Sequence, residues 1–175
     1  MVLSLFGKSA ATDRVFAVYS AIVAQSRQPR FYADWGVPDT VTGRFDMISL
    51  HMALLFRRLK GESAEARRFS QSLFDLFFRD MDRQLREMGA GDLAVPKKIK
   101  KMGNIFYGLL ASLDTALTAG DAAAVEAVLA RNIYDADPGP GANALAVYLL
   151  DESRRLADLP AAEVMRAPSS AGAAA

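Results

Sequence analysis

Residues 63–89, SAEARRFSQSLFDLFFRDMDRQLREMG, decide the fold class. Large apolar side chains recur here every three or four residues, which is the period of an α-helix with one buried face. This apolar stripe consists of Phe69, Leu73, Phe77, Met81, Leu85 and Met88. Ser63 is a favourable helix N-cap, and Gly89 suits the position just after a helix end. The stretch therefore predicts one long amphipathic helix.

The opposite face of this helix carries alternating charges, from Asp75, Arg79, Asp82 and Arg86. The pairs Asp75–Arg79 and Asp82–Arg86 are four residues apart with the acid first, an order worth about 0.2–0.5 kcal/mol when exposed. We expect a solvated, salt-bridged face, with contact to a partner protein as the alternative. A metal site is not expected, because helical dimetal sites combine glutamates with several histidines.

Helical periodicity continues on both sides of this stretch, and no alternating strand pattern persists. The predicted helices cover residues 12–27, 44–60, 63–88, 96–120, 121–134 and 142–157. Prolines and glycines interrupt residues 28–43, which are predicted to form an aromatic-rich loop between the first two helices. We expect an all-α fold of about six helices in one compact domain over residues 1–159. Residues 160–175 are rich in alanine and are expected to be a disordered tail.

Composition excludes several kinds of chemistry. The 175 residues include no cysteine, one histidine and one tryptophan, and their formal charge is +1. Without cysteine there is no disulfide scaffold, no thiolate catalysis and no cysteine-ligated zinc. A single histidine excludes multi-histidine metal sites. The near-balance of charge argues against a dedicated nucleic-acid binder. We expect no cofactor and no metal ion.

Basic residues are nevertheless concentrated in one place. Residues 1–120 hold 17 Lys and Arg against 12 Asp and Glu, whereas residues 121–175 hold 4 against 8. Four of the six lysines are Lys97, Lys98, Lys100 and Lys101. They lie at the predicted start of a helix, where cations oppose the helix dipole. Ribosomal RNA or anionic lipid would offer compensating phosphates. The alternative is a solvated helix end, because one short basic run is a weak pattern.

No apolar run reaches the roughly 18 residues that suggest a membrane-spanning helix. Residues 16–24 imitate the core of a signal peptide, but Tyr19 and Ser20 interrupt it and the cleavage site after it is poor. A first amphipathic helix is the better interpretation. We therefore expect a cytoplasmic protein, which can still work at a membrane surface.

Aromatic and turn residues gather in residues 31–38, FYADWGVP. Either these rings cover the helical core, or they form an exposed apolar patch that holds a hydrophobic client. The candidate client contacts are Phe31, Tyr32, Trp35, Val37, Pro38, Asp39, Arg44, Phe45 and His51. The helical neighbours of His51 are apolar, which favours a buried histidine. A small-molecule or enzymatic site built on His51 stays open as an alternative.

Long stretches of the chain resemble the ubiquinol–cytochrome c chaperone family. The matching stretches are FYADWGVPDT (31–40), GRFD (43–46), LH (50–51), RRLK (57–60), QSLFD (71–75), FRDMDRQLREMG (78–89), GDLAVPKKIK (91–100), FYG (106–108) and RNIY (131–134). The resemblance covers roughly residues 10–155. Where the bacterial pattern commonly has an arginine and then an Ala-Tyr pair, this chain has Leu109 and Ser112-Leu113. The departure makes the surrounding helix more apolar.

The resemblance implies an all-helical, non-enzymatic assembly factor. Mitochondrial members of the family bind newly made cytochrome b beside the ribosomal tunnel exit, together with a small helical partner, and support assembly of ubiquinol–cytochrome c reductase. For this chain it implies a chaperone for a nascent membrane protein, with cytochrome b as the expected client. It also implies contact with the ribosome and peripheral contact with the inner membrane. A structural helical adaptor that forms a homodimer is a further alternative.

Overall fold

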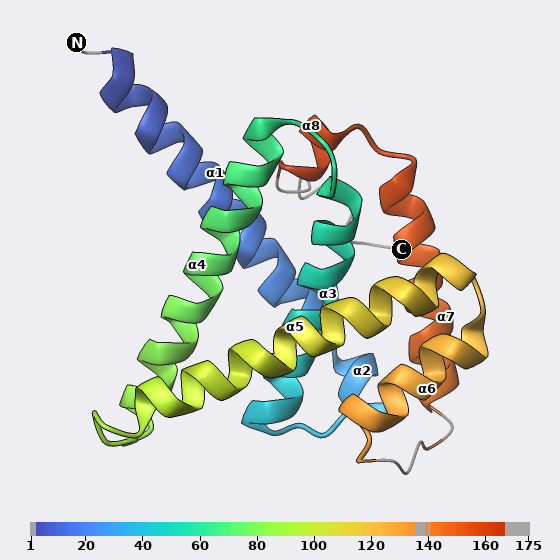
Figure 1. Cartoon of the computed structure of the whole chain (residues 1–175). Helices are drawn as coiled ribbons and strands as arrows, with labels where there is room; N and C mark the ends of the chain where they lie inside the picture. Colours follow the sequence, from blue (N-terminus) through green and yellow to red (C-terminus); the bar gives the residue numbers. More distant parts are fainter. Residues whose placement is uncertain (1–2, 136–138, 140, 167–175) are drawn as a thin grey trace. The chain divides into compact units, whose positions relative to one another are not determined.

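The computed structural model describes residues 3–135, 139 and 141–166, with side chains from residue 10 onward, and these residues form helices and turns but no strand (Figure 1). The helices are α1 (Leu3–Ser26), α2 (Pro29–Ala33), α3 (Val41–Leu59), α4 (Ala64–Glu87), α5 (Val95–Ala119), α6 (Ala122–Asn132), α7 (Gly141–Ala157) and α8 (Ala161–Val164). The all-α prediction is confirmed. No helix in this part of the chain combines the length and apolarity needed to cross a bilayer.

Local chemistry sets the helix ends. The Ser63 hydroxyl accepts a hydrogen bond from the Ala66 amide at 3.1 Å, and the Asp121 carboxylate accepts one from the Ala123 amide at 3.0 Å. These bonds satisfy amide groups that the first turns of α4 and α6 leave without an intrahelical partner. Gly89 follows α4 with φ of +82°, a conformation that glycine adopts without steric cost. The predicted starts of these two helices are confirmed.

Two helices begin earlier than the sequence pattern indicates. α1 starts at Leu3 and α3 at Val41, and the predicted loop over residues 28–43 contains the short helix α2. Pro29 is the first residue of α2, a position where proline's missing amide costs no hydrogen bond. The loop prediction is therefore wrong for one helical turn and correct for the residues between α2 and α3.

The end of the chain also differs from expectation. Residues 160–166 include α8, and the side chains of Val164 and Met165 are buried. The prediction of disorder is therefore wrong for this part of the alanine-rich tail, because it forms a short helix and buries two apolar side chains. The rest of the expected tail, residues 167–175, lies outside the described residues.

The chain divides into two compact units. Unit 1 comprises residues up to 21, 59–102 and those from 160, and so contains α4, α8 and parts of α1 and α5. Four of the six stripe residues predicted for α4 are buried, namely Phe69, Leu73, Phe77 and Met81. The Tyr19 ring of α1 lies 6.3 Å from the Phe77 ring, and its hydroxyl donates to Asp80 at 2.8 Å. Met88, at the end of the predicted stripe, is exposed.

Unit 2 comprises residues 22–58 and 103–159, and α6 and α7 lie side by side within it (Figure 1). Its core runs through α2, α3, α5, α6 and α7. Leu109 and Leu113, the departures from the family pattern, are both buried in this core. Their apolar character is therefore explained by packing. Arg57 forms an ion pair with Asp114 of α5.

A carboxylic acid is buried in unit 2 at Asp46 of α3. Burial, reinforced by the negative charge of Asp135, raises the pKa of Asp46 from 3.8 to about 7. The folded protein therefore holds a proton that the unfolded chain releases between about pH 4 and pH 7. Stability falls as pH rises through this window, and the whole penalty is present above pH 7.

We expect Asp46→Asn to remove this pH dependence. The variant should gain stability over the wild type as pH rises, by up to about 4 kcal/mol at pH 8, and should gain little at pH 4. Urea unfolding of both proteins at several pH values measures the difference directly. A difference that is the same at pH 4 and pH 8 would contradict the raised pKa.

Candidate functional site

The aromatic segment over residues 31–38 is part of unit 2 and contributes Phe31 and Val37 to its core. The Phe31 side chain is completely buried. Its ring centroid lies 5.4 Å from that of Trp35, 5.7 Å from that of His51 and 5.3 Å from that of Tyr148 on α7. These separations fall in the range where aromatic rings attract one another beyond simple burial. Phe31 is thus the centre of an aromatic cluster.

Arg30 covers this cluster from outside. Its guanidinium carbon lies 5.2 Å from the ring centroid of Phe31, 5.4 Å from that of Trp35 and 5.1 Å from that of Tyr148. Cation–π attraction at such distances is worth about 0.5–1 kcal/mol at exposed sites. Sequence analysis missed Arg30 and Tyr148, because nothing in the local pattern around either residue indicates that they meet.

His51 is held by neutral groups. Its Nδ1 lies 2.8 Å from the carbonyl oxygen of Met47, and its Nε2 lies 2.8 Å from the hydroxyl of Tyr148. The tautomer protonated on Nδ1 donates to the carbonyl and accepts from Tyr148, so both ring nitrogens are satisfied. Burial lowers the pKa of His51, which keeps the ring neutral. This arrangement is that of a structural core histidine.

The structure places Phe31 and Val37 of the aromatic segment in the core and leaves other residues of the segment at the surface. Phe31, Val37, Phe45 and His51 are buried, so they are not part of an exposed client-binding patch. The remaining five candidates reach the surface, with Tyr32 and Trp35 half-buried and Pro38, Asp39 and Arg44 exposed. Arg44 pairs with Asp39 at 2.8 Å.

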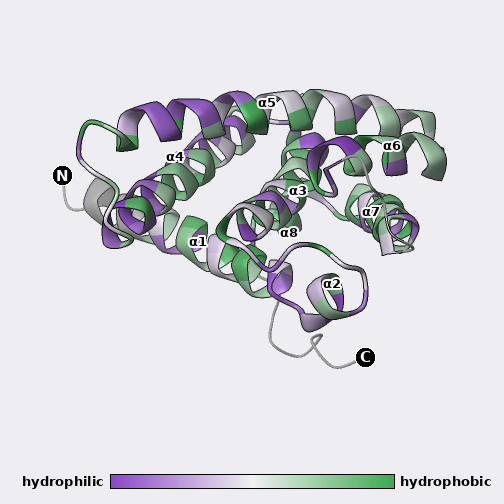
Figure 2. Cartoon of the chain, turned by 90° about the horizontal axis from the view of Figure 1, so that it is seen from below, coloured by the Kyte–Doolittle hydropathy of each residue, from purple (hydrophilic) through white to green (hydrophobic). Residues whose placement is uncertain are grey.

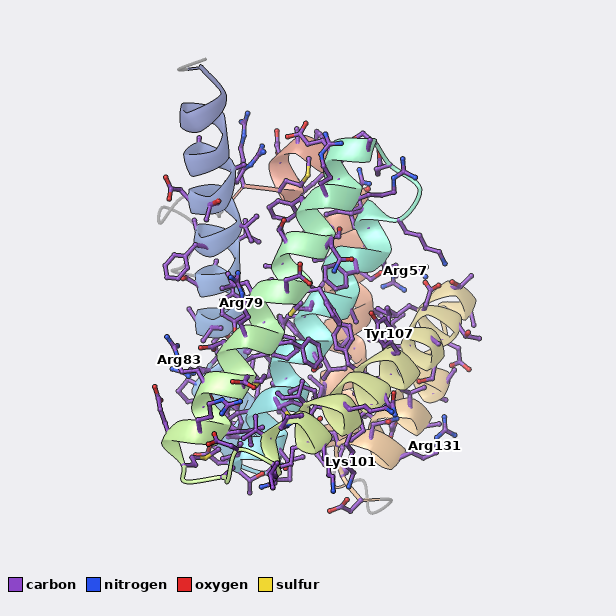
Figure 3. All side chains as sticks on the ribbon, turned by 60° about the vertical axis from the view of Figure 1, so that its left-hand side comes forward. Arg57, Arg79, Arg83, Lys101, Tyr107 and Arg131 are labelled. Atoms are coloured by element: carbon purple, nitrogen blue, oxygen red, sulfur yellow. The ribbon has the colours of Figure 1, made fainter. Side chains whose placement is uncertain are left out.

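The four lysines occupy the first turns of α5. Lys97, Lys98, Lys100 and Lys101 are all exposed, and Figure 3 labels Lys101 on this helix. Figure 2 shows α5 changing from hydrophilic in these turns to more hydrophobic further along. Just before the helix, Leu93 is 90% exposed. This end of unit 1 therefore presents clustered positive charge beside one protruding apolar side chain.

The polar face of α4 is only partly as predicted. Asp82 pairs with Arg86 at 2.6 Å, and Arg86 also reaches Asp92 at 2.6 Å. The predicted Asp75–Arg79 ion pair is wrong. The Asp75 carboxylate instead accepts from the Gln71 amide at 2.8 Å, while Arg79 Nε donates to the backbone carbonyl of Asp75 at 3.3 Å. The side-chain amide of Gln71 therefore binds the Asp75 carboxylate in place of the predicted Arg79.

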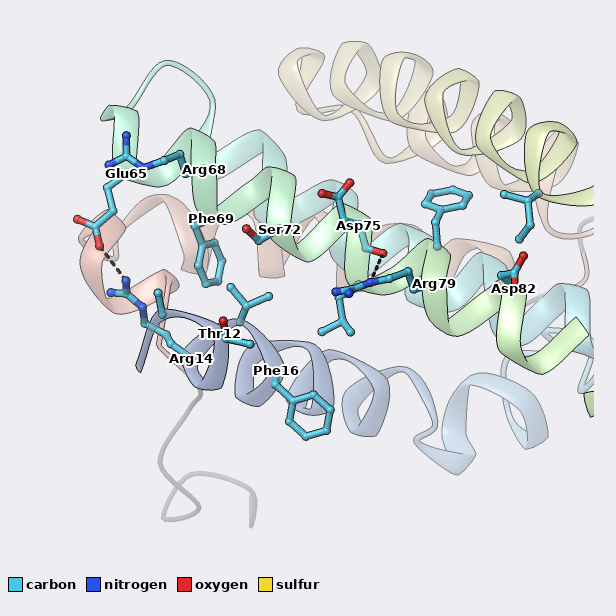
Figure 4. A pocket seen from close by; sticks show the side chains of 15 residues that line it. Thr12, Arg14, Phe16, Glu65, Arg68, Phe69, Ser72, Asp75, Arg79 and Asp82 are labelled. Atoms are coloured by element: carbon cyan, nitrogen blue, oxygen red, sulfur yellow. Dashed lines mark hydrogen bonds and ion pairs between the residues drawn. The ribbon is translucent and has the colours of Figure 1, made fainter. Parts of the chain in front are cut away.

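Along this face runs a cleft that the sequence did not reveal. It has a volume of about 1140 Å³ and lies between α1 and α4 (Figure 4), and Ile99 of α5 also lines it. Phe16 of α1 lines it and is 60% exposed. The sequence signal for this exposure is that Phe16 falls outside the helical stripe formed by Val15, Tyr19 and Ile22, all of which are buried. We call this feature the α1–α4 cleft.

Among the described residues, no group of three His, Asp or Glu side chains is placed to hold a metal ion. The described surface includes an open cleft with charged walls and a cluster of exposed lysines, and the aromatic segment packs on the core of unit 2.

Comparison with known proteins identifies the family. The family model described as ubiquinol–cytochrome C chaperone matches residues 33–171. A crystal structure of the Cbp3 homolog from Brucella abortus is similar to this chain, with 42% sequence identity, a TM-score of 0.84, and coverage of 95% of this chain and 94% of that one. No curated protein gave a significant match. The sequence resemblance is thus confirmed, and the chain belongs to the ubiquinol–cytochrome c chaperone family.

Proposed function

We propose that this protein is a non-enzymatic chaperone for a nascent hydrophobic membrane protein, with cytochrome b as its client, during assembly of ubiquinol–cytochrome c reductase. Membership of the chaperone family over residues 33–171 carries the proposal. The neutral, fully hydrogen-bonded surroundings of His51 support a role without acid–base chemistry. They weigh against the alternative of an enzymatic site at this residue.

The proposed client-facing surface is the exposed rim of the aromatic segment. Tyr32, Trp35, Pro38, Asp39 and Arg44 remain accessible there. The buried rings beneath them hold this rim in one conformation, because Phe31 anchors the segment to the core. A rigid rim binds a client with a smaller loss of conformational entropy than a flexible loop would.

The lysine cluster is proposed to contact phosphate, of ribosomal RNA or of lipid. All four ammonium groups are accessible, and their mutual repulsion at a helix start would be relieved by anions. With this contact the protein would work in the cytoplasm at the ribosome or at the surface of the inner membrane. A small helical partner remains part of the proposal by analogy with mitochondrial members of the family.

The proposal is tested in cells that encode this protein. Deletion of its gene should lower the amount of ubiquinol–cytochrome c reductase and of b-type haem, seen in reduced-minus-oxidised spectra. A photocrosslinking residue at Pro38 or Asp39 should capture cytochrome b, and one at Lys98 or Lys101 should capture ribosomal or membrane components.

A crosslinker at Arg154, exposed on α7, is the control position and should give neither product. Normal reductase levels in the deletion strain would overturn the role in assembly. If the deletion strain has the expected loss of reductase but no position crosslinks to cytochrome b, the choice of client is overturned.

A further inference from the structure

The α1–α4 cleft lies wholly within unit 1 and combines an apolar floor with charged walls. Exposed Phe16 lines it from α1, and half-buried Leu76 and Phe78 line it from α4, with the buried Phe69 beneath. Figure 4 shows the Phe69 side chain pointing from α4 toward α1, and Phe16 on the outer side of α1. An elongated apolar groove between two helices is the usual seat for a third helix.

The charges on the walls are unequally compensated. Glu65 is paired with Arg14 at 2.9 Å, and Asp82 is paired with Arg86 at 2.6 Å. Asp75 accepts only from a neutral amide.

The two remaining cations at the cleft have no such partner. Within the described part of the chain, neither Arg68 nor Arg79 forms an ion pair with a carboxylate. Arg79 donates one N–H to the backbone carbonyl of Asp75, and the other N–H groups of its guanidinium remain available to a ligand. Apart from the single charge of Asp75, the unpaired charge at the cleft is therefore positive.

The spacing of these two arginines matches helical geometry. They are eleven residues apart on α4, which corresponds to three turns and about 16 Å along the axis. Both line the same cleft, so they lie on one side of the helix. A helix lying along α4 would face both of them with residues that are also eleven positions apart.

We propose that the α1–α4 cleft binds an amphipathic helix of a partner protein, with its apolar stripe on Phe16, Leu76 and Phe78 and two acidic residues, three turns apart, on Arg68 and Arg79. Charge selects this occupant over a membrane-spanning segment. A segment that is apolar all round would bury these guanidinium groups without partners, which is costly. An acidic amphipathic helix supplies the missing carboxylates and keeps its polar side in water.

The test uses the full chain and two designed 18-residue helical peptides labelled with fluorescein. Both carry a leucine stripe; one has two glutamates eleven residues apart at its edge, and the other has lysines there. Fluorescence anisotropy should show the glutamate peptide binding about tenfold more tightly. The double variant Arg68→Glu/Arg79→Glu should reverse this preference, and Phe16→Asp should weaken binding of both peptides.

Arg67→Glu is the matched control, because Arg67 is exposed on α4 but does not line the cleft. This variant should keep the wild-type preference. Equal binding of both peptides by the wild type, or a preference that the double variant leaves unchanged, would overturn the proposal. Stronger competition by an uncharged apolar peptide in detergent micelles would also overturn it and would assign the cleft to a membrane segment.

Discussion

Phe31→Ala is expected to lower the free energy of unfolding of unit 2 by about 3–5 kcal/mol, the usual cost of removing a fully buried phenylalanine ring. The ring is completely buried and touches three aromatic neighbours, so its loss opens a cavity that rigid rings cannot close. The Arg30 guanidinium also loses one of the three rings that it covers. Urea unfolding followed by far-ultraviolet circular dichroism measures the change.

Phe16→Ala provides the matched control for this prediction. It removes the same side chain from a position that is 60% exposed, so we expect a loss of less than about 1 kcal/mol. A cost at Phe31 as small as that at Phe16 would contradict the assignment of Phe31 to the core. It would reopen the interpretation of residues 31–38 as a surface patch.

Gly141→Ala is expected to destabilise unit 2 by about 3 kcal/mol or more, at the upper end of overpacking effects. Gly141 is the first residue of α7, and its Cα faces the backbone of Trp35. A Cβ atom there would overlap the carbonyl group and the Cα of Trp35. Backbone atoms cannot turn aside as a side chain does, and the same carbonyl accepts a hydrogen bond from Tyr134 at 2.9 Å. Relief would therefore require movement of the whole aromatic segment.

Gly108→Ala is the control for Gly141→Ala. Gly108 lies inside α5 with open space where its Cβ would be, so alanine should stabilise the protein by about 0.5–1 kcal/mol. Thermal unfolding of the two variants beside the wild type gives shifts of opposite sign. A Gly141→Ala protein as stable as the wild type would mean that Trp35 and α7 do not meet through their backbones.

The features that sequence analysis predicted correctly are those set by neighbouring residues. α4 follows from its own apolar period and from the Ser63 cap, which acts within one turn. The family resemblance was likewise recoverable, because its stretches are continuous in sequence. The prediction for the alanine-rich end was wrong where Val164 and Met165 add buried apolar surface to a segment that otherwise consists mostly of small residues.

The candidate site was less predictable, because it depends on contacts between residues far apart in the chain. Exposed and buried rings look alike in sequence, so only the packing of Tyr148 on Phe31 decides the aromatic segment. The α1–α4 cleft is lined by residues from separate parts of the chain, such as Phe16 of α1 and Leu76 of α4. Even the predicted Asp75–Arg79 ion pair does not form, because the Asp75 carboxylate binds Gln71 of the same helix instead.

The placement of Trp35 gives this protein an internal optical reporter. It is the only tryptophan in the chain, and in unit 2 its ring lies beneath the Arg30 guanidinium and beside Tyr148. Its fluorescence emission therefore follows the melting of unit 2, whereas circular dichroism follows helices in both units. If the two signals change at different urea concentrations, the units unfold in separate steps. One urea titration followed by both signals thus tells whether the protein unfolds as a whole or in parts.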